Sequence, residues 1–151
     1  MEKHINSILV ALNDSVSSRE MIDCLINLPL CPEECDISLI HFFRKPTASI
    51  DLMGKKFTTE MPSRMLSVLQ KAKNRLIEHG FIQDKIKTDL ITDLYPTVSE
   101  GIIDQYNKGR YDMVVIGRKR MSKAEEFVMG DISIKLIRAL EGSAILVVKS
   151  K

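Results

Sequence analysis

Short apolar runs alternate with segments of helical spacing along the sequence, and this alternation restricts the fold more than any other feature. Each run has the length of a strand, is rich in β-branched residues and is bounded by polar residues or glycine. The five runs span residues 8–12, 37–43, 86–91, 113–116 and 144–148. Strands and helices that alternate in this way predict a doubly wound α/β domain, with a parallel sheet, right-handed crossovers and helices on both faces.

Two helices are predicted from apolar stripes between the runs. Met21, Cys24, Leu25 and Leu28 recur at i, i+3, i+4 and i+7, which places Cys24 among the core residues of the first helix. A longer stripe of the same kind runs over residues 61–76 and predicts the second helix.

Two further helices are predicted from the signals at their ends. The third is expected to begin at Thr97, which has capping-box spacing to Glu100, and to stop near Gly109. The fourth has Asp131 as its N-cap candidate and Gly142 just past its end. Its apolar face is formed by Ile132, Leu136 and Leu140.

The third apolar run differs from the other four, because polar and apolar residues alternate in it. This pattern is typical of an edge strand, where charged residues discourage pairing with another chain. An edge position for the third strand predicts the order 3-2-1-4-5, a Rossmann-like sheet whose winding switches between strands 1 and 4. Ligands of such sheets bind beside the switch, so the segments to inspect are residues 13–15 and 117–133.

Two connections are longer than this class of fold requires. One spans residues 44–60 and the other residues 118–129. Each is interpreted either as a lid or contact surface over the ligand edge or as a variable surface loop.

Composition excludes several classes of protein. The chain has 151 residues, 44% of them hydrophobic and 28% charged, which predicts one globular domain over residues 1–151. A net charge of +2 argues against nucleic acid as the main partner. No apolar run approaches the roughly 18 residues of a membrane span, and no cleavage signal follows the N-terminus, so a cytoplasmic location is expected.

The cysteines and histidines give no catalytic or metal motif. Three cysteines without an export signal are interpreted as reduced thiols, and Cys31 and Cys35 have no second pair at zinc spacing. His4, His41 and His79 lack a nucleophile or carboxylate partner in any motif, so they are interpreted as surface or packed residues.

Rossmann and P-loop signatures are both missing from the first turn, because residues 13–17 contain no glycine. Four segments instead resemble the universal stress protein family: residues 8–15, 113–120, 127–133 and 144–148. In that family the fourth strand runs into Gly-x2-Gly-x9-Gly-(Ser/Thr), which wraps the ribose and phosphates of ATP in nucleotide-binding members. The opening strand of the family usually ends in Asp-Gly-Ser.

Position by position, the resemblance implies a degenerate nucleotide site. Gly117 and Gly130 match the first and third glycines, whereas Arg120 replaces the second and Asp131 replaces the Ser or Thr; Asn13 and Asp14 replace the Asp and Gly of the opening strand. Glycine allows positive φ or close approach of backbone to phosphate, and arginine does not. Two unit charges about 4 Å apart repel by about 1 to 4 kcal/mol, so the carboxylate of Asp131 would weaken phosphate binding by about one to three decades.

A basic cluster beside the same helix end can be interpreted in two ways. Arg118, Lys119, Arg120 and Lys123 could neutralise Asp131 or remain solvated, or they could bind phosphates with their side chains. The resemblance further implies that the stretch around Ile40 and His41 contacts adenine through its main chain. The candidate nucleotide-binding set is therefore Asn13, Asp14, Ser15, Ile40, His41, Gly117, Arg118, Arg120, Gly130, Asp131, Ile132 and Ser133.

The last apolar run predicts a partner, because a long terminal edge strand stays exposed unless something covers it. Members of the family commonly pair this strand with its symmetry mate, and Ile145, Leu146, Val147 and Val148 resemble such a homodimer interface. The predicted function is that of a homodimeric, stress-associated regulatory protein that requires no cofactor and binds ATP weakly or not at all. The alternatives are an ATP or AMP binder that uses Arg118, Lys119 and Arg120, and a hydrolase or transferase, for which no nucleophile and base stand at motif spacing.

Overall fold

The computed structural model describes residues 5–13, 15–43, 55–118, 123 and 132–149, and it describes side chains for all of these except 15–16 and 55–62. Strands and helices alternate along the chain, with two short 3-10 turns at Pro32–Glu34 and Gln83–Lys85. The elements are β1 (Ser7–Ala11), α1 (Ser15–Ile26), β2 (Asp36–Phe42), α3 (Lys55–Glu78), β3 (Ile86–Ile91), α4 (Val98–Gly109), β4 (Met113–Arg118), α6 (Ile132–Ala139) and β5 (Ala144–Lys149).

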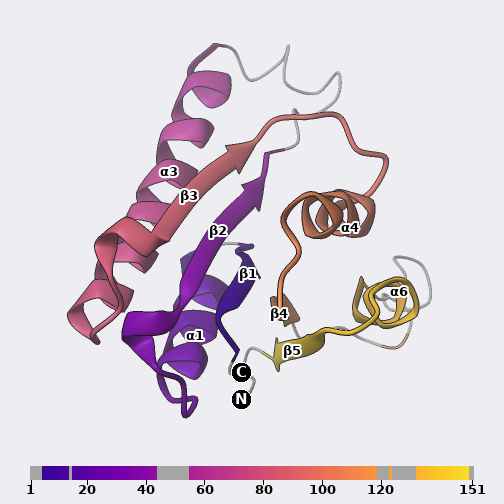
Figure 1. Ribbon diagram of the computed structural model, residues 1–151. Helices are drawn as coiled ribbons and strands as arrows, with labels where there is room; N and C mark the ends of the chain where they lie inside the picture. The colour runs from indigo at the N-terminus through magenta and orange to yellow at the C-terminus, as the bar shows by residue number, and fades with distance from the viewer. Residues whose placement is uncertain (1–4, 14, 44–54, 119–122, 124–131, 150–151) are drawn as a thin grey trace.

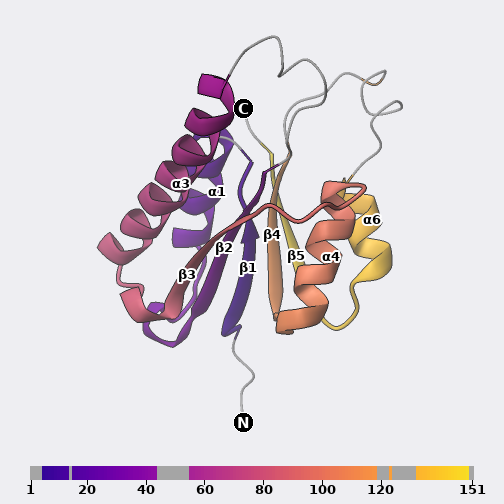
Figure 2. The same ribbon diagram turned by 90° about the horizontal axis from the view of Figure 1, so that it is seen from above.

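The five strands form one parallel sheet in the order β3-β2-β1-β4-β5, which confirms the predicted topology. Helices α1 and α3 cover one face of this sheet, and α4 and α6 cover the other (Figures 1 and 2). The central strand β1 pairs with both β2 and β4; Ile8, for example, lies opposite Ile37 on one side and Met113 on the other. The winding therefore switches at β1 and β4.

Alternate residues of each central strand supply two separate cores. In β1 and just after it, Ile8, Val10 and Leu12 belong to the core under α1 and α3, whereas Leu9 and Ala11 belong to the core under α4 and α6. All five are buried. Burial on both faces is why the runs of the central strands are apolar almost without interruption.

Strand β3 lies at the sheet edge, as its alternating pattern predicted. Lys87, Thr88 and Asp89 are exposed, and Ile86 and Ile91 at its two ends are buried. The polar middle of this strand faces solvent, so the edge carries charge where an unpaired strand would otherwise attract another chain.

The signals at the ends of α4 act as predicted. The Thr97 hydroxyl oxygen accepts a hydrogen bond of 3.2 Å from the backbone N–H of Glu100, and the helix ends at Gly109. Leu136 in α6 and Leu140 just past its end are buried but Ile132 is 40% exposed, so Ile132 lies at the margin of the apolar face. The N-cap candidate Asp131 lies outside the described residues.

Two expectations were wrong in detail. Helix α3 begins at Lys55, so the connection predicted over residues 44–60 is shorter by six residues. Pro62 favours a later start, because proline suits the first turn of a helix and lacks the N–H donor of a helix interior, yet α3 continues through Pro62 back to Lys55. Cys24 is only half-buried, because the buried face of α1 is centred on Met21, Ile22 and Leu25.

The three cysteines form no disulfide. The Cys35 thiol donates to the carbonyl oxygen of Cys31 at 3.2 Å, and burial raises the pKa of this thiol. Within the part of the chain that the structure describes, no helix is both long and apolar enough to cross a membrane.

Candidate functional site

The carboxyl ends of β1 and β4 meet at the switch in winding, and one side-chain bond joins them. Asn13 follows β1, and its Nδ2 donates a hydrogen bond of 3.2 Å to the carbonyl oxygen of Gly117 in β4. Both residues are half-exposed at this edge. The structure thus brings together two of the candidate residues that are 104 positions apart in the sequence.

Gly117 is required by the packing around it. A Cβ at this position would lie 2.8 Å from the sulfur of Met21 and 3.2 Å from Asn13 Nδ2. Met21 is fully buried under α1, so its side chain has little room to give way. A glycine here is therefore explained by the contact between β4 and α1, without any ligand.

The end of β2 is tied to the end of β1 through both main chain and side chain. The N–H of Leu12 donates to the carbonyl oxygen of Ile40 at 2.8 Å, and Nδ1 of His41 lies 2.7 Å from the carbonyl oxygen of Leu12. Because a carbonyl oxygen only accepts, the Nδ1–H tautomer of His41 is the one that fits this contact. Ile40 is buried, whereas His41 is half-exposed.

Sequence reasoning missed this side-chain role of His41, for which it considered only a main-chain contact. The contact depends on the register of β1 against β2, which places Ala11 opposite Ile40. Neither strand contains a motif that reports this register.

The end of β4 carries a cation next to another cation on β5. Arg118 is half-buried and lies directly opposite Lys149 in the parallel pairing of the two strands. Lys149 is exposed and was not among the predicted site residues. An alignment of the apolar runs at residues 113–116 and 144–148 would have placed Lys149 opposite Arg118.

The first turn of α6 supplies two more candidates that differ in accessibility. Ser133 is buried at 8% exposure, whereas Ile132 is largely exposed. Lys123 is also exposed. The remaining candidates are outside the described residues, either wholly (Asp14, Lys119, Arg120, Gly130 and Asp131) or in their side chain (Ser15).

No group of three or more histidine, cysteine or acidic side chains within the described ranges could hold a metal ion. What this part of the edge offers a ligand is the main chain after β1 and β2, the Arg118 and Lys149 cations, and the beginning of α6. Such a set can bind an anion, and it contains no paired nucleophile and base.

The model of the universal stress protein family matches residues 4–149, almost the whole chain. The chain belongs to the universal stress protein family. No curated protein matches the sequence at a significant level.

Solved structures of universal stress proteins share the fold at low sequence identity. One in complex with cAMP is 14% identical, with a TM-score of 0.66 and coverage of 99% of this chain and 100% of that chain. UspA from Lactobacillus plantarum is 11% identical, with a TM-score of 0.69 and coverage of 97% and 99%. A protein from Archaeoglobus fulgidus in complex with dAMP is 13% identical, with a TM-score of 0.56 and coverage of 97% and 100%.

Proposed function

We propose that this universal stress protein is a homodimeric regulatory protein of the stress response that acts through protein partners and requires no cofactor. Its nucleotide site is degenerate, so that ATP binds weakly or not at all. The assignment to the family supports the regulatory role.

The hydrogen bond from Asn13 to Gly117 is the observation that carries the proposal of a degenerate site. The Asn13 amide uses one of its two N–H donors on a backbone carbonyl, which orients the side chain toward β4 and leaves one N–H for a phosphate. The His41 ring is engaged in the same way with Leu12. The side chains of Asn13 and His41, which could contact a nucleotide, thus each bind a backbone carbonyl and hold the strand ends together.

The sequence of the loop supports the same conclusion. Arg120 and Asp131 stand at two motif positions where glycine and a hydroxyl residue are expected. Gly117 is the motif glycine that the structure describes. Its close contact with Met21 favours glycine at this position for packing alone. Its presence therefore does not require a nucleotide.

One observation favours the alternative, in which the chain binds ATP or AMP. Arg118 and Lys149 stand side by side at the ends of β4 and β5, where they could contact phosphates together with Lys119 and Arg120. Two universal stress proteins of the same fold were crystallised with cAMP and dAMP.

Isothermal titration calorimetry with Mg-ATP and with AMP separates these functions. We expect no saturable heat up to about 1 mM nucleotide for the unaltered protein, and we expect Arg120→Gly combined with Asp131→Ser to create measurable binding. Arg110→Gly is the matched control, because it removes an exposed cation at a residue with φ of 52° just before β4. Tight binding by the unaltered protein would refute the degenerate site and establish the alternative.

A further inference from the structure

A groove of about 500 Å³ runs between α1 and α3, on the helical layer that covers one face of the sheet. This volume lies within the range of small-molecule sites, about 300 to 1,000 Å³. The groove is separate from the candidate nucleotide residues, because its lining comes from the exposed seam of the two helices. Its principal lining residues are Ser18, Arg19 and Ile22 of α1 with Val68, Lys71 and Ala72 of α3.

The floor of the groove is apolar. Ile22 is fully buried and Ala72 is nearly fully buried, whereas Val68 is half-buried. An alkyl or aromatic body placed on these side chains would lose contact with water, which favours binding of an apolar group.

One polar group within this lining is left unsatisfied. Ser18 is 2% exposed, and its hydroxyl has no hydrogen-bond partner among the residues that the structure describes. Most buried polar side-chain atoms do have a partner, so an orphaned hydroxyl beside a groove calls for an explanation. The Ser18 oxygen has almost no exposed surface, so this hydroxyl lies beneath the groove and does not reach a ligand held at its rim.

The rim adds two cations without partners. Arg19 and Lys71 are exposed, and neither forms an ion pair or hydrogen bond with the described part of the chain. They stand on opposite sides of the groove, one on each helix. Positive charge on both walls favours a ligand with a negative charge.

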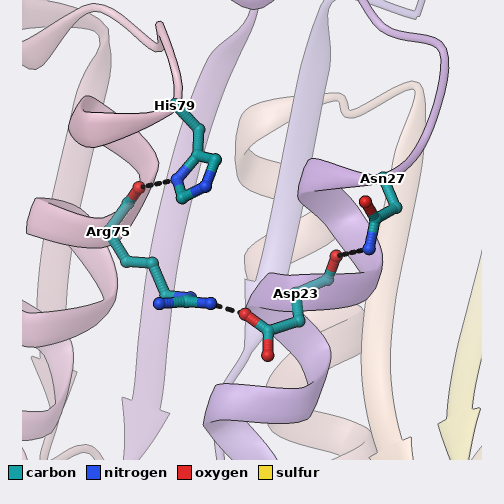
Figure 3. A network of polar contacts seen from close by, with 4 residues as sticks. All are labelled: Asp23, Asn27, Arg75 and His79. Carbon is teal, nitrogen blue, oxygen red and sulfur yellow. Dashed lines mark hydrogen bonds and ion pairs between the residues drawn. The ribbon is translucent and has the colours of Figure 1, made fainter.

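A polar network fixes the two helices beside the groove (Figure 3). Nε of Arg75 in α3 donates to the carboxylate of Asp23 in α1 at 2.5 Å. Nδ1 of His79 contacts the carbonyl oxygen of Arg75, and the Asn27 amide donates to the carbonyl oxygen of Asp23. Asp23 offsets the charge of Arg75, and Glu78, the one acidic residue of the lining, offsets part of the charge of Arg19 and Lys71, so the lining stays net positive.

We propose that the groove between α1 and α3 binds a small organic anion with an apolar body, of the class of medium-chain carboxylates. Its carboxylate is held by Arg19 and Lys71, while its chain lies against Val68 on the apolar side of the groove. This site goes beyond the proposed regulatory function and does not depend on the nucleotide site.

Octanoate is the probe for this site, followed by ¹H–¹⁵N NMR on the full chain up to about 10 mM, a range that captures millimolar affinity. We expect saturable shifts in the amide signals of residues 18–22 and 68–75. Octylammonium has the same chain with the opposite charge and should produce no saturable shift there.

Three variants assign the contacts. Arg19→Gln with Lys71→Gln should weaken octanoate binding about tenfold or more, because it removes two charge-assisted contacts. Ser18→Ala should leave octanoate affinity unchanged, because the hydroxyl lies beneath the groove surface. Lys135→Gln is the control, because Lys135 is exposed on α6 at the opposite face of the sheet.

The proposal is overturned by any of four results. These are no saturable shift with octanoate, equal binding of octylammonium, shifts centred outside the groove, or unchanged affinity in the double variant of Arg19 and Lys71.

Discussion

Asn13 and Gly117 are joined by a hydrogen bond of 3.2 Å from the side-chain amide of one to the carbonyl oxygen of the other, across 104 residues of sequence. The bond lies at the carboxyl ends of β1 and β4, beside the switch in winding. Ligands of a doubly wound sheet usually bind at this edge. Asn13 stands at the position where the family motif has its Asp, and its side chain joins the ends of two strands.

This bond should contribute to stability. We expect Asn13→Ala to lower the free energy of unfolding by about 1 kcal/mol, the usual net value of a hydrogen bond, and the melting temperature by about 2 to 4 °C. Asn107→Ala, at an exposed position of α4, should be neutral or slightly stabilising because alanine favours helix. Chemical denaturation of the two variants is the measurement, and equal stabilities would contradict a structural role for Asn13.

Two neighbouring buried serines of α1 should respond to alanine in opposite directions. The Ser18 hydroxyl has no hydrogen-bond partner in the described part of the chain, so Ser18→Ala should raise the free energy of unfolding by about 1 kcal/mol. Ser17 is equally buried but does form an interaction, so Ser17→Ala should lower it. Thermal unfolding measures both changes, and a loss of stability in Ser18→Ala would show that the hydroxyl is satisfied in solution.

Asp104 should titrate below the ordinary range of an aspartate. The Tyr95 hydroxyl donates to its carboxylate at 2.6 Å and lowers its pKa, and Lys108 at 3.0 Å lowers it further. A pKa lowered by folding adds stability that is present above the unfolded pKa of about 3.9 and is lost as the pH falls through the folded pKa.

Carboxyl ¹³C NMR measures this titration directly. Tyr95→Phe keeps the ring, which packs edge-on against Phe42, and removes the hydroxyl; it should therefore raise the pKa of Asp104. Lys108→Gln should raise it less, because the hydroxyl has the larger effect. An unchanged pKa in Tyr95→Phe would show that the hydrogen bond is absent in solution.

The proposed homodimer predicts a specific response to charge on β5. We expect sedimentation equilibrium at micromolar concentration to give twice the chain mass of 17.1 kDa. Ala144→Lys, at an exposed position of β5, should shift the protein toward monomer, because charge on an edge strand opposes pairing. Thr88→Lys places the same charge on β3 at the opposite edge and should leave the dimer intact. A monomeric unaltered protein would exclude pairing through β5.

The sheet was predictable because each strand carries its own evidence. Alternation in Ile86–Ile91 placed β3 at the edge, and the continuous apolar runs of the other strands indicated cover on both faces, since burial on one or two faces acts directly on composition. Thr97 and Glu100 likewise predicted the beginning of α4, because a capping bond forms within one turn of helix.

The beginning of α3 was less predictable from sequence. Residues 55–60 carry no decisive signal of their own, and their helix extends from a segment that is packed further along. Propensity alone is a weak guide where the tertiary contacts of a neighbouring turn decide the outcome.

The sequence by itself determined the fold class, the strand order, the family and the motif positions where this chain departs from the family, because periodicity and motif residues are local properties. Tertiary structure alone decided that Asn13 binds Gly117, that His41 binds the main chain of Leu12, and that the Ser18 side chain is buried beside two cations on different helices. Those contacts join segments whose distance and register are set by packing, and no local pattern in the chain encodes them.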